Sequence, residues 1–564
     1  MQRVVDGFGV LVATGLLVVA SSASQADGGP PKLGIPVAAR AITEAGYRAA
    51  VKVLASDAFE GRKPGQAGEA KTLDYLESEF RAIGLKPGTA HGYRQEVPLV
   101  EITASPSAKL TVSSAAGKAD FAFAEDMVVW TKRVVPKVEV TDSPLVFVGY
   151  GIVAPEFGWN DYAGIDMHGK TAVILINDPG FATKDPKVFR GGAMTYYGRW
   201  TYKSEEAMRQ GALAALIVHQ TAPAAYGWDV VRNSNSGPHL DPETADGNAK
   251  RVAIEGWITL ESAKRTFALG GQDFERLEAS AARPGFHAIS LAATASVGVE
   301  NQIRHARSAN VIGLIEGAKR PKENVLYMAH WDHFGIAPAG AAAGDRIFNG
   351  AVDNATGVAG ILEIAKAFVH AKHRPERSVV FLAVTAEEAG LLGSAYYGAN
   401  PVFPLAATAA AFNIDALSPV GRTRDVEVVG YGASELEDVL GTYAAAQGRV
   451  LKPDSQPEKG HFFRSDHFML AKYGVPALYI KSGSDSREHP AGWTEAWEAD
   501  YLANRYHKPA DEYRPDWNVR GSLEDLQLLY AVGNHVANEA SWPKWRATSE
   551  FRAIREQSRG AASH

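Results

Sequence analysis

The sequence contains no cysteine among its 564 residues. This absence excludes disulfide bonds, a zinc site built on thiolates, a cysteine nucleophile and a lipidated cysteine. The chain must therefore be stabilised by an ordinary hydrophobic core. Its composition, with 46% hydrophobic and 22% charged residues, is typical of a globular protein. A chain of this length is expected to fold as more than one domain.

An excess of positive charge is also missing, because the formal net charge is -6. Proteins that neutralise many phosphates normally show clustered lysine and arginine residues. We therefore expect no nucleic acid among the partners of this chain.

Long hydrophobic runs are absent except near the N-terminus, where an apolar stretch extends from about Gly7 to Ala20. Arg3 precedes this stretch, and small residues follow it as far as Ala26. The stretch is too short to cross a hydrocarbon core of about 30 Å comfortably. The pattern predicts a signal peptide over residues 1–26, and hence a periplasmic or secreted protein without a stable membrane anchor after cleavage. An uncleaved anchor is the alternative.

The rest of the chain divides into segments with different sequence patterns. Residues 34–140 begin with two helical patterns and continue as short, weakly alternating strands. Residues 141–299 contain short β-like runs separated by turns rich in glycine, proline and asparagine, which predicts an inserted β-rich domain. Residues 300–548 alternate strands and helices and predict an α/β fold. Residues 549–564 are polar and basic, and we expect this tail to be frayed.

One helix is predicted with particular clarity, from Asn354 or Thr356 to about Ala371. Apolar residues recur there at helical intervals and form a stripe suited to covering a sheet. The stripe consists of Val358, Ile361, Leu362, Ala365, Phe368 and Val369.

Side chains of metal-binding type follow the predicted strands and turns of this α/β region. The segment NVLYMAHWDH predicts a buried strand with His330 at its C-terminal end. In open α/β sheets, the ligand-binding sites lie at the C-terminal ends of the strands. The five candidate ligands are His330, Asp353, Glu388, Asp415 and His507. Five nitrogen and oxygen ligands can hold two divalent ions if one carboxylate bridges them. Zinc fits the imidazole content best, while manganese and cobalt stay open.

The adjacent acids Glu387 and Glu388 are predicted to have different roles. Because a turn after a strand points neighbouring side chains in different directions, one acid can bind metal while the other stands beside the attacking water as a general base. Asp332, two residues after His330, is placed to hydrogen-bond the far nitrogen of that ligand or a neighbouring group.

Each of these residues alone has an ordinary structural explanation. Asp353 can belong to the cap of the following helix together with Asn354, and a Glu-Glu pair is usually a solvated turn. The ordered series of histidines and carboxylates, most of them beside small residues, favours a metal site instead.

These segments resemble the M28 family of metallo-aminopeptidases, and the inserted β-rich region resembles a protease-associated (PA) domain. The resemblance runs from DAFEGR, residues 57–62, to Tyr506 and His507, and so covers most of the chain. It implies a zinc-exopeptidase-like fold, a mixed sheet covered by helices on both faces. It also implies two Zn²⁺ ions per chain, with Asp353 bridging them, His330 and Asp415 on one ion, and Glu388 and His507 on the other.

The resemblance further assigns Glu387 as the general base, Asp332 as the supporting acid and Tyr506 as a donor to the oxyanion. The chain departs from the family pattern at Val352, where many relatives have a second aspartate before the bridging Asp353. The implied activity is that of a zinc-dependent aminopeptidase, which releases N-terminal amino acids from peptides with a free N-terminus by means of dizinc-activated water. A glutaminyl cyclase-like or carboxypeptidase-like enzyme and a non-catalytic peptide-binding protein remain as alternatives.

Several further polar residues are candidates for the pocket lining. His333, His461 and the cluster RSDH at residues 464–467 fall in this group, and we expect structural hydrogen bonding from them more than catalysis.

Overall fold

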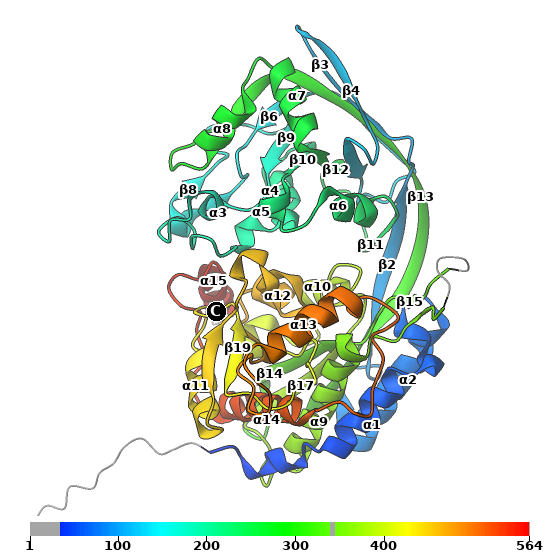
Figure 1. Ribbon diagram of the computed structural model, residues 1–564, viewed down its shortest axis with the longest axis vertical. Coiled ribbons are helices and arrows are strands. Elements are labelled where there is room, and N and C mark those ends of the chain that lie inside the picture. Colours follow the sequence, from blue (N-terminus) through cyan, green and yellow to red (C-terminus); the bar gives the residue numbers. More distant parts are fainter. Residues whose placement is uncertain (1–33, 339–343, 563–564) are drawn as a thin grey trace, which may run out of the picture.

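The computed structural model describes residues 34–338 and 344–562. The predicted signal peptide, residues 1–26, lies outside the described residues. Figure 1 shows an upper and a lower body connected by the long strands β2 (Arg94–Ala104) and β13 (Ile289–Ile315). These strands pair with each other antiparallel. Both strands continue from one body into the other and so join the bodies, and β11 (Pro238–Pro242) pairs antiparallel with β2 as a third strand.

The lower body is built on a mixed sheet. Its strands after β13 are β14 (Arg320–His330), β17 (Arg377–Val384), β18 (Thr408–Asn413), β19 (Asp425–Val429), β20 (Val450–Pro453) and β21 (Ala477–Ser482). Strand β14 pairs parallel with β17 and β18, and β18 pairs parallel with β21. Strands β13 and β19 pair antiparallel with β17 and β21. Parallel strands with both faces covered read as continuous apolar runs, and every residue of β17 is buried accordingly.

Helices cover both faces of this sheet, as the alternation along β14 shows. Val325 and Tyr327 pack with one set of helices, whereas Leu326 and Met328 pack into a second core on the opposite face. The first set is α1 (Glu44–Leu54), α2 (Ala67–Ile83), α9 (Thr356–Val369), α11 (Leu436–Ala446) and α14 (Arg520–Asn538). The opposite face carries α10 (Leu392–Ala399) and α12 (His467–Ala471). The predicted fold class is confirmed, and the helix expected from Asn354 or Thr356 is α9.

The upper body consists of a second set of strands with helices packed on them. The strands are β3 (Lys109–Ser114), β4 (Gly117–Ala122), β5 (Met127–Trp130), β6 (Lys137–Phe147), β9 (Thr171–Leu175), β10 (Ala214–His219) and β12 (Ile254–Thr259). The helices are α3 (Pro179–Thr183), α4 (Trp200–Arg209), α5 (Thr221–Ala224), α6 (Trp228–Asn235), α7 (Leu260–Leu269) and α8 (Phe274–Ala281). Strands β6, β9, β10 and β12 run parallel.

The upper body differs from the sequence-based expectation in two respects. Strands β3 and β4 precede residue 141, yet β3 pairs with the upper part of β13 and β4 pairs with β3. The segment is also less purely β than expected, because helices such as α4 and α7 pack against its parallel strands. Alternating apolar runs at 109–130 did not reveal which sheet they would join.

The C-terminal segment differs most from its expectation. Residues 552–562 form helix α15 (Arg552–Ala562) instead of a frayed tail. The Arg555 guanidinium donates hydrogen bonds to the carbonyl oxygens of Leu405 and Thr408, at 3.0 and 2.7 Å, and Phe551 is buried. These contacts anchor a helix whose own composition is polar.

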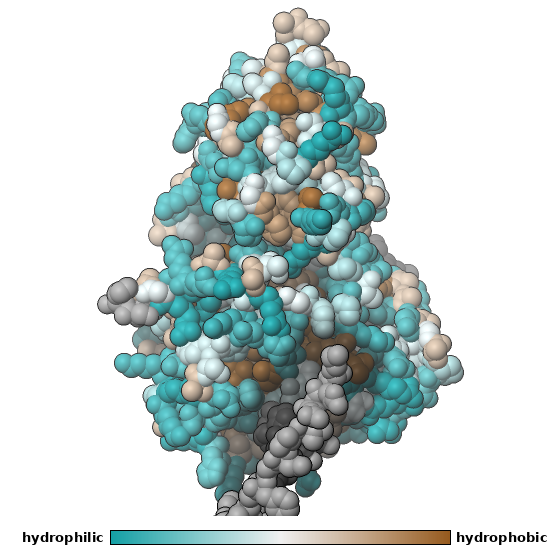
Figure 2. All heavy atoms as spheres, turned by 90° about the vertical axis from the view of Figure 1, so that its left-hand side faces the viewer, coloured by the Kyte–Doolittle hydropathy of each residue, from teal (hydrophilic) through white to brown (hydrophobic). Residues whose placement is uncertain are grey.

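The surface turned toward the viewer in Figure 2 is mainly hydrophilic, with separate hydrophobic patches. None of the helices in the described part of the chain has both the length and the apolar character needed to cross a membrane.

Candidate metal centre

The candidate ligands gather at one edge of the lower sheet. His330 ends β14, Glu388 lies in the turn after β17, and Asp415 follows the end of β18 by two residues. These three strands are parallel, so their carboxyl ends meet at the same edge. Asp353 lies in the irregular turn before α9, and His507 in the turn after α13 (Trp493–Asn504).

Asp353 lies at the middle of the cluster, with each carboxylate oxygen facing a different histidine. Its Oδ1 lies 3.1 Å from Nε2 of His330, and its Oδ2 lies 3.1 Å from Nε2 of His507. The Asp415 Oδ1 atom lies 3.3 Å from the same His330 nitrogen, and Glu388 Oε2 lies 3.2 Å from the same His507 nitrogen. The structure therefore brings all five predicted residues together, in two groups that share Asp353.

Glu387 also belongs to this cluster. One of its carboxylate oxygens lies within 4.8 Å of a ring nitrogen of His330 and an oxygen of Asp415. Burial raises the pKa of the Glu387 carboxyl well above its usual value, and the neighbouring Glu388 charge acts in the same direction.

The electrostatics of the cluster show a shortage of positive charge. Burial acts to raise the pKa of Asp353, but hydrogen bonds from His330 and His507 outweigh it and hold the pKa well below its usual value. Burial lowers the pKa of His507, yet the bonds to Asp353 and Glu388 raise it to about 10. Four neighbouring carboxylates thus face two histidines. A donor set of imidazole nitrogens and carboxylate oxygens with excess negative charge fits two divalent cations of the zinc, manganese or cobalt type.

The side chain of Asp332 stabilises the turn that contains Glu387 and Glu388. Its carboxylate accepts hydrogen bonds from the backbone N–H groups of Glu387, at 3.0 Å, and Glu388, at 3.3 Å. The far nitrogen of His330, Nδ1, faces the backbone carbonyl of Asp332 at 3.2 Å, while the nearer carboxylate oxygen is 3.9 Å away. The main chain of Asp332 therefore orients the histidine, and its side chain positions the glutamates.

Tyr506 lies at the rim of the cluster. Its ring stacks on that of His507, with centroids 3.7 Å apart, and 39% of the residue is exposed. Partial burial and the nearby carboxylates, Asp353 first among them, raise the pKa of the Tyr506 phenol well above its usual value, so the phenol keeps its proton and can donate it.

The extra polar residues take mainly structural positions. The Nδ1 atom of His333 lies 2.6 Å from Glu388 Oε1, and the Ser465 hydroxyl donates to Asp415 Oδ2 at 2.6 Å. Asp466 accepts a hydrogen bond from Ser394. His461 pairs with Asp454, at 3.1 Å, away from the ligands.

Sequence reasoning missed two supports of the cluster. The Asp511 carboxylate accepts the N–H groups of Val352 and Asp353, both at 3.1 Å, and so fixes the main chain of the central ligand. The buried Arg62 guanidinium donates to the carbonyl oxygens of Trp331 and Gly350, each at 2.9 Å. Asp511 follows His507 by only four residues, which is a usable signal. Arg62 offered no local signal of this role, because Trp331 and Gly350 lie 269 and 288 residues away in the sequence.

Comparison with known proteins adds an independent line of evidence. Residues 310–531 match the sequence profile of Peptidase family M28. "Aminopeptidase NAALADL1" of Mus musculus is 33% identical over 118 residues, which cover 20% of this chain and 14% of that protein. "Glutamate carboxypeptidase 2 homolog" of Caenorhabditis elegans is 29% identical over 196 residues, covering 34% of this chain and 20% of that protein. The chain thus spans a fifth or less of the length of these two relatives.

Two of the solved structures that match this chain cover more of it, at lower identity. An aminopeptidase from Aneurinibacillus sp. strain AM-1 is 20% identical with a TM-score of 0.46, covering 89% of this chain and 96% of the other. The zinc aminopeptidase BSAP from Bacillus subtilis is 18% identical with a TM-score of 0.40, covering 92% and 99%.

Proposed function

Residues 310–531 form a domain of peptidase family M28, and on this premise we propose that the chain is a zinc-dependent aminopeptidase that releases N-terminal amino acids from peptides. The observation that carries the proposal is the position of Asp353 between His330 and His507, with a further carboxylate beside each histidine. This is the arrangement that two ions sharing one carboxylate require.

The metal-binding roles follow from the two groups around Asp353. His330 and Asp415 would hold one zinc ion and Glu388 and His507 the other, with Asp353 shared between them. When bound, zinc would polarise the scissile carbonyl and make the attacking water more acidic. The carboxylates that are not engaged can pair with the free amine of the substrate, which would favour cleavage at the N-terminus.

Glu387 is the proposed general base. It belongs to the cluster, and its carboxyl makes no hydrogen bond to another side chain among the described residues, so it is free to take a proton from the attacking water and deliver it to the leaving amine. Asp332 positions Glu387 through the backbone N–H that it accepts. Tyr506, at the rim, is the proposed donor to the developing oxyanion.

A carboxypeptidase-like activity is the second candidate. It is favoured by the relative named glutamate carboxypeptidase 2 homolog, which aligns over 34% of this chain. Such an enzyme would remove residues from the other end of the peptide.

Mass spectrometry of peptide digestion separates these activities. A peptide with a free amine and its N-acetylated twin are incubated with the purified protein, each with and without a chelator. We expect stepwise loss of N-terminal residues from the free peptide only, abolished by the chelator. Loss of C-terminal residues from both peptides would instead establish the second candidate, and cleavage that persists in chelator would contradict the zinc-dependent chemistry.

We also propose that the protein is exported, on the basis of the apolar stretch near residues 7–20. N-terminal sequencing of the protein recovered from the periplasm or medium tests this, and a chain that starts after Ala26 is the expected result. A full-length chain retained in the cytoplasm would contradict the proposal.

A further inference from the structure

A large cavity lies between the upper and the lower body. It is bordered by α4 of the upper body and by α10 and α12 of the lower body, with Ser204, Tyr396 and Met469 among its lining residues. Its volume of about 820 Å³ falls within the range of roughly 300–1,000 Å³ that is typical of small-molecule sites. None of the candidate metal ligands, all of which lie in the described part of the chain, borders this cavity. The cavity is therefore a place, separate from the metal centre, where a small molecule can bind.

Two charged side chains in the wall of this cavity, Glu255 and Arg251, have no partner of opposite charge. Glu255 lies on β12 and is only 2% exposed, and Arg251 lies three residues before that strand and is half-buried. Within residues 34–338 and 344–562, neither the carboxylate nor the guanidinium makes a hydrogen bond or an ion pair, and the two do not pair with each other. Burial raises the pKa of the Glu255 carboxyl, while the charges of Lys132 and Arg251 act against this effect. A buried charge is costly unless an opposite charge joins it.

Apart from these two, the charged groups of the wall are either paired with an opposite charge or exposed to water. Lys132 lies 3.0 Å from Asp241 within the upper body. Lys472 of the lower body lies 2.6 Å from Glu205 of the upper body. The cavity thus offers a ligand one buried acid and one largely buried base that are not already engaged.

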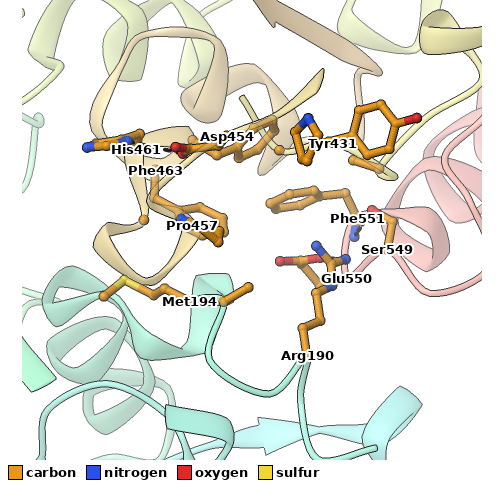
Figure 3. Close-up of a pocket in the computed structure, with 16 residues that line it drawn as sticks. Arg190, Met194, Tyr431, Asp454, Pro457, His461, Phe463, Ser549, Glu550 and Phe551 are labelled. Atoms are coloured by element: carbon orange, nitrogen blue, oxygen red, sulfur yellow. Dashed lines mark hydrogen bonds and ion pairs between the residues drawn. The ribbon is translucent and has the colours of Figure 1, made fainter. Parts of the chain in front are cut away.

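A second, smaller cavity between the bodies has no such unengaged charges in its wall. Figure 3 shows Arg190 beside Glu550 and His461 beside Asp454, at 2.8 and 3.1 Å. The rest of this wall is mainly aromatic and apolar, as Phe551 illustrates. A position between the bodies therefore does not by itself leave charges unpaired, and Glu255 and Arg251 distinguish the large cavity.

We propose that the large cavity binds a free α-amino acid with an apolar side chain, whose carboxylate pairs with Arg251 and whose ammonium group pairs with Glu255. The guanidinium suits a carboxylate because it offers planar, charge-assisted donors. Trp200, Leu392 and Met469 provide apolar surface for the side chain of the ligand. A molecule that carries both charges satisfies the acid and the base at once.

The position of the cavity points to the source of this ligand. Gly390 borders the cavity and donates its backbone N–H to the carbonyl oxygen of Glu387, at 2.8 Å. The cavity therefore extends to the turn that contains the candidate base. That the ligand is an amino acid rests on the proposed function, because the proposed reaction releases amino acids at the neighbouring centre. The upper body, which supplies Arg251 and Glu255, then takes part in binding the product.

Equilibrium dialysis of the zinc-loaded full chain with labelled L-leucine tests the inference. We expect the unmodified protein to bind one more leucine per chain than Arg251→Met or Glu255→Gln, with the affinity of this site at least about tenfold weaker in each variant. L-leucinamide lacks the carboxylate and N-acetyl-L-leucine lacks the ammonium group, so each should compete at least about tenfold more weakly than unlabelled leucine. Equal competition by all three compounds would overturn the inference, even if a variant failed to fold.

Matched variants separate the effect from a general loss of structure. Glu243→Gln removes a charge from the same wall, but Glu243 is already paired with His305, at 2.9 Å, and this variant should keep the additional leucine. Arg251→Lys should recover part of the affinity that Arg251→Met loses, and melting temperatures check that the variants are folded. Equal leucine binding by the unmodified protein, Arg251→Met and Glu255→Gln would overturn the inference, as would no binding at all. Dialysis requires no hydrolysis, so a failure to cleave peptides would overturn the proposed function and leave the binding result standing.

Discussion

The candidate metal centre and the boundary between the two bodies differ in their charge balance. In the centre, several carboxylates crowd around two histidines. At the boundary, each of two cations has an acid beside it, since Arg190 lies 2.8 Å from Glu550 and Lys472 lies 2.6 Å from Glu205. The centre therefore keeps an excess of negative charge, and we interpret it as a site prepared for cations.

Removal of metal should have the largest effect and act on the acidic region only. We expect a chelator to abolish hydrolysis and to lower the melting temperature by roughly 5–15 °C, because the crowded carboxylates lose their counter-charge. Activity assays and calorimetry before and after adding zinc back measure this. An unchanged melting temperature and unchanged activity in chelator would contradict the interpretation that the centre binds cations.

Glu387→Gln should lower kcat by about 10²- to 10⁴-fold because the general base is lost. Its neighbour provides the matched control, since Glu388→Gln should also lower the zinc content measured by atomic absorption, whereas Glu387→Gln should retain it. Normal turnover by the Glu387→Gln protein would undo the assignment of the base.

Asp511→Asn should weaken zinc binding by about 10- to 100-fold through the main chain of Asp353. An amide offers one acceptor oxygen, while the carboxylate of Asp511 accepts the N–H groups of both Val352 and Asp353. Zinc affinity is measured by competition with a chelating dye. Asp516→Asn, at an exposed acid paired with Arg514, is the control and should leave the affinity unchanged.

The smallest expected effect is the pH dependence of the unfolding free energy that His467 contributes. His467 is fully buried between the rings of Phe462 and Tyr479, and burial lowers its pKa to about 3. The folded state therefore keeps this imidazole neutral while the unfolded chain binds a proton below about pH 6.5. Stability contributed by the neutral ring is present above that pH and is lost as the pH falls toward 3.

Between pH 7 and pH 5 this linkage amounts to about 2 kcal/mol of unfolding free energy. His467→Phe keeps an aromatic ring in place without a titrating group, so its stability should fall less over this range. Urea unfolding of both proteins at the two pH values measures the difference. Parallel losses in the two proteins would show that His467 does not carry this pH dependence.

The elements of the lower body could be predicted from local patterns. The stripe from Val358 to Val369 predicted a helix that ends within two residues of the expected position. The candidate ligands could be selected because parallel strands expose residue types of one chemistry at their carboxyl ends, and His330 and Asp415 follow this rule.

Other features depended on contacts between distant segments. The polar tail forms α15, and Arg555 fixes this helix by donating hydrogen bonds to the carbonyl groups of Leu405 and Thr408. Strand β3 joined the upper sheet because β13 extends that far. No local pattern encodes such partners.

The sequence by itself determined the α/β class, the absence of cysteine chemistry and the five candidate ligand positions, since these depend on composition and on short-range periodicity. Only the tertiary structure placed Asp353 between two histidines and Asp511 behind it. The physical reason is that a site is defined by distances of a few ångströms between side chains that lie many residues apart. Those distances are fixed by how the two bodies and their sheets pack.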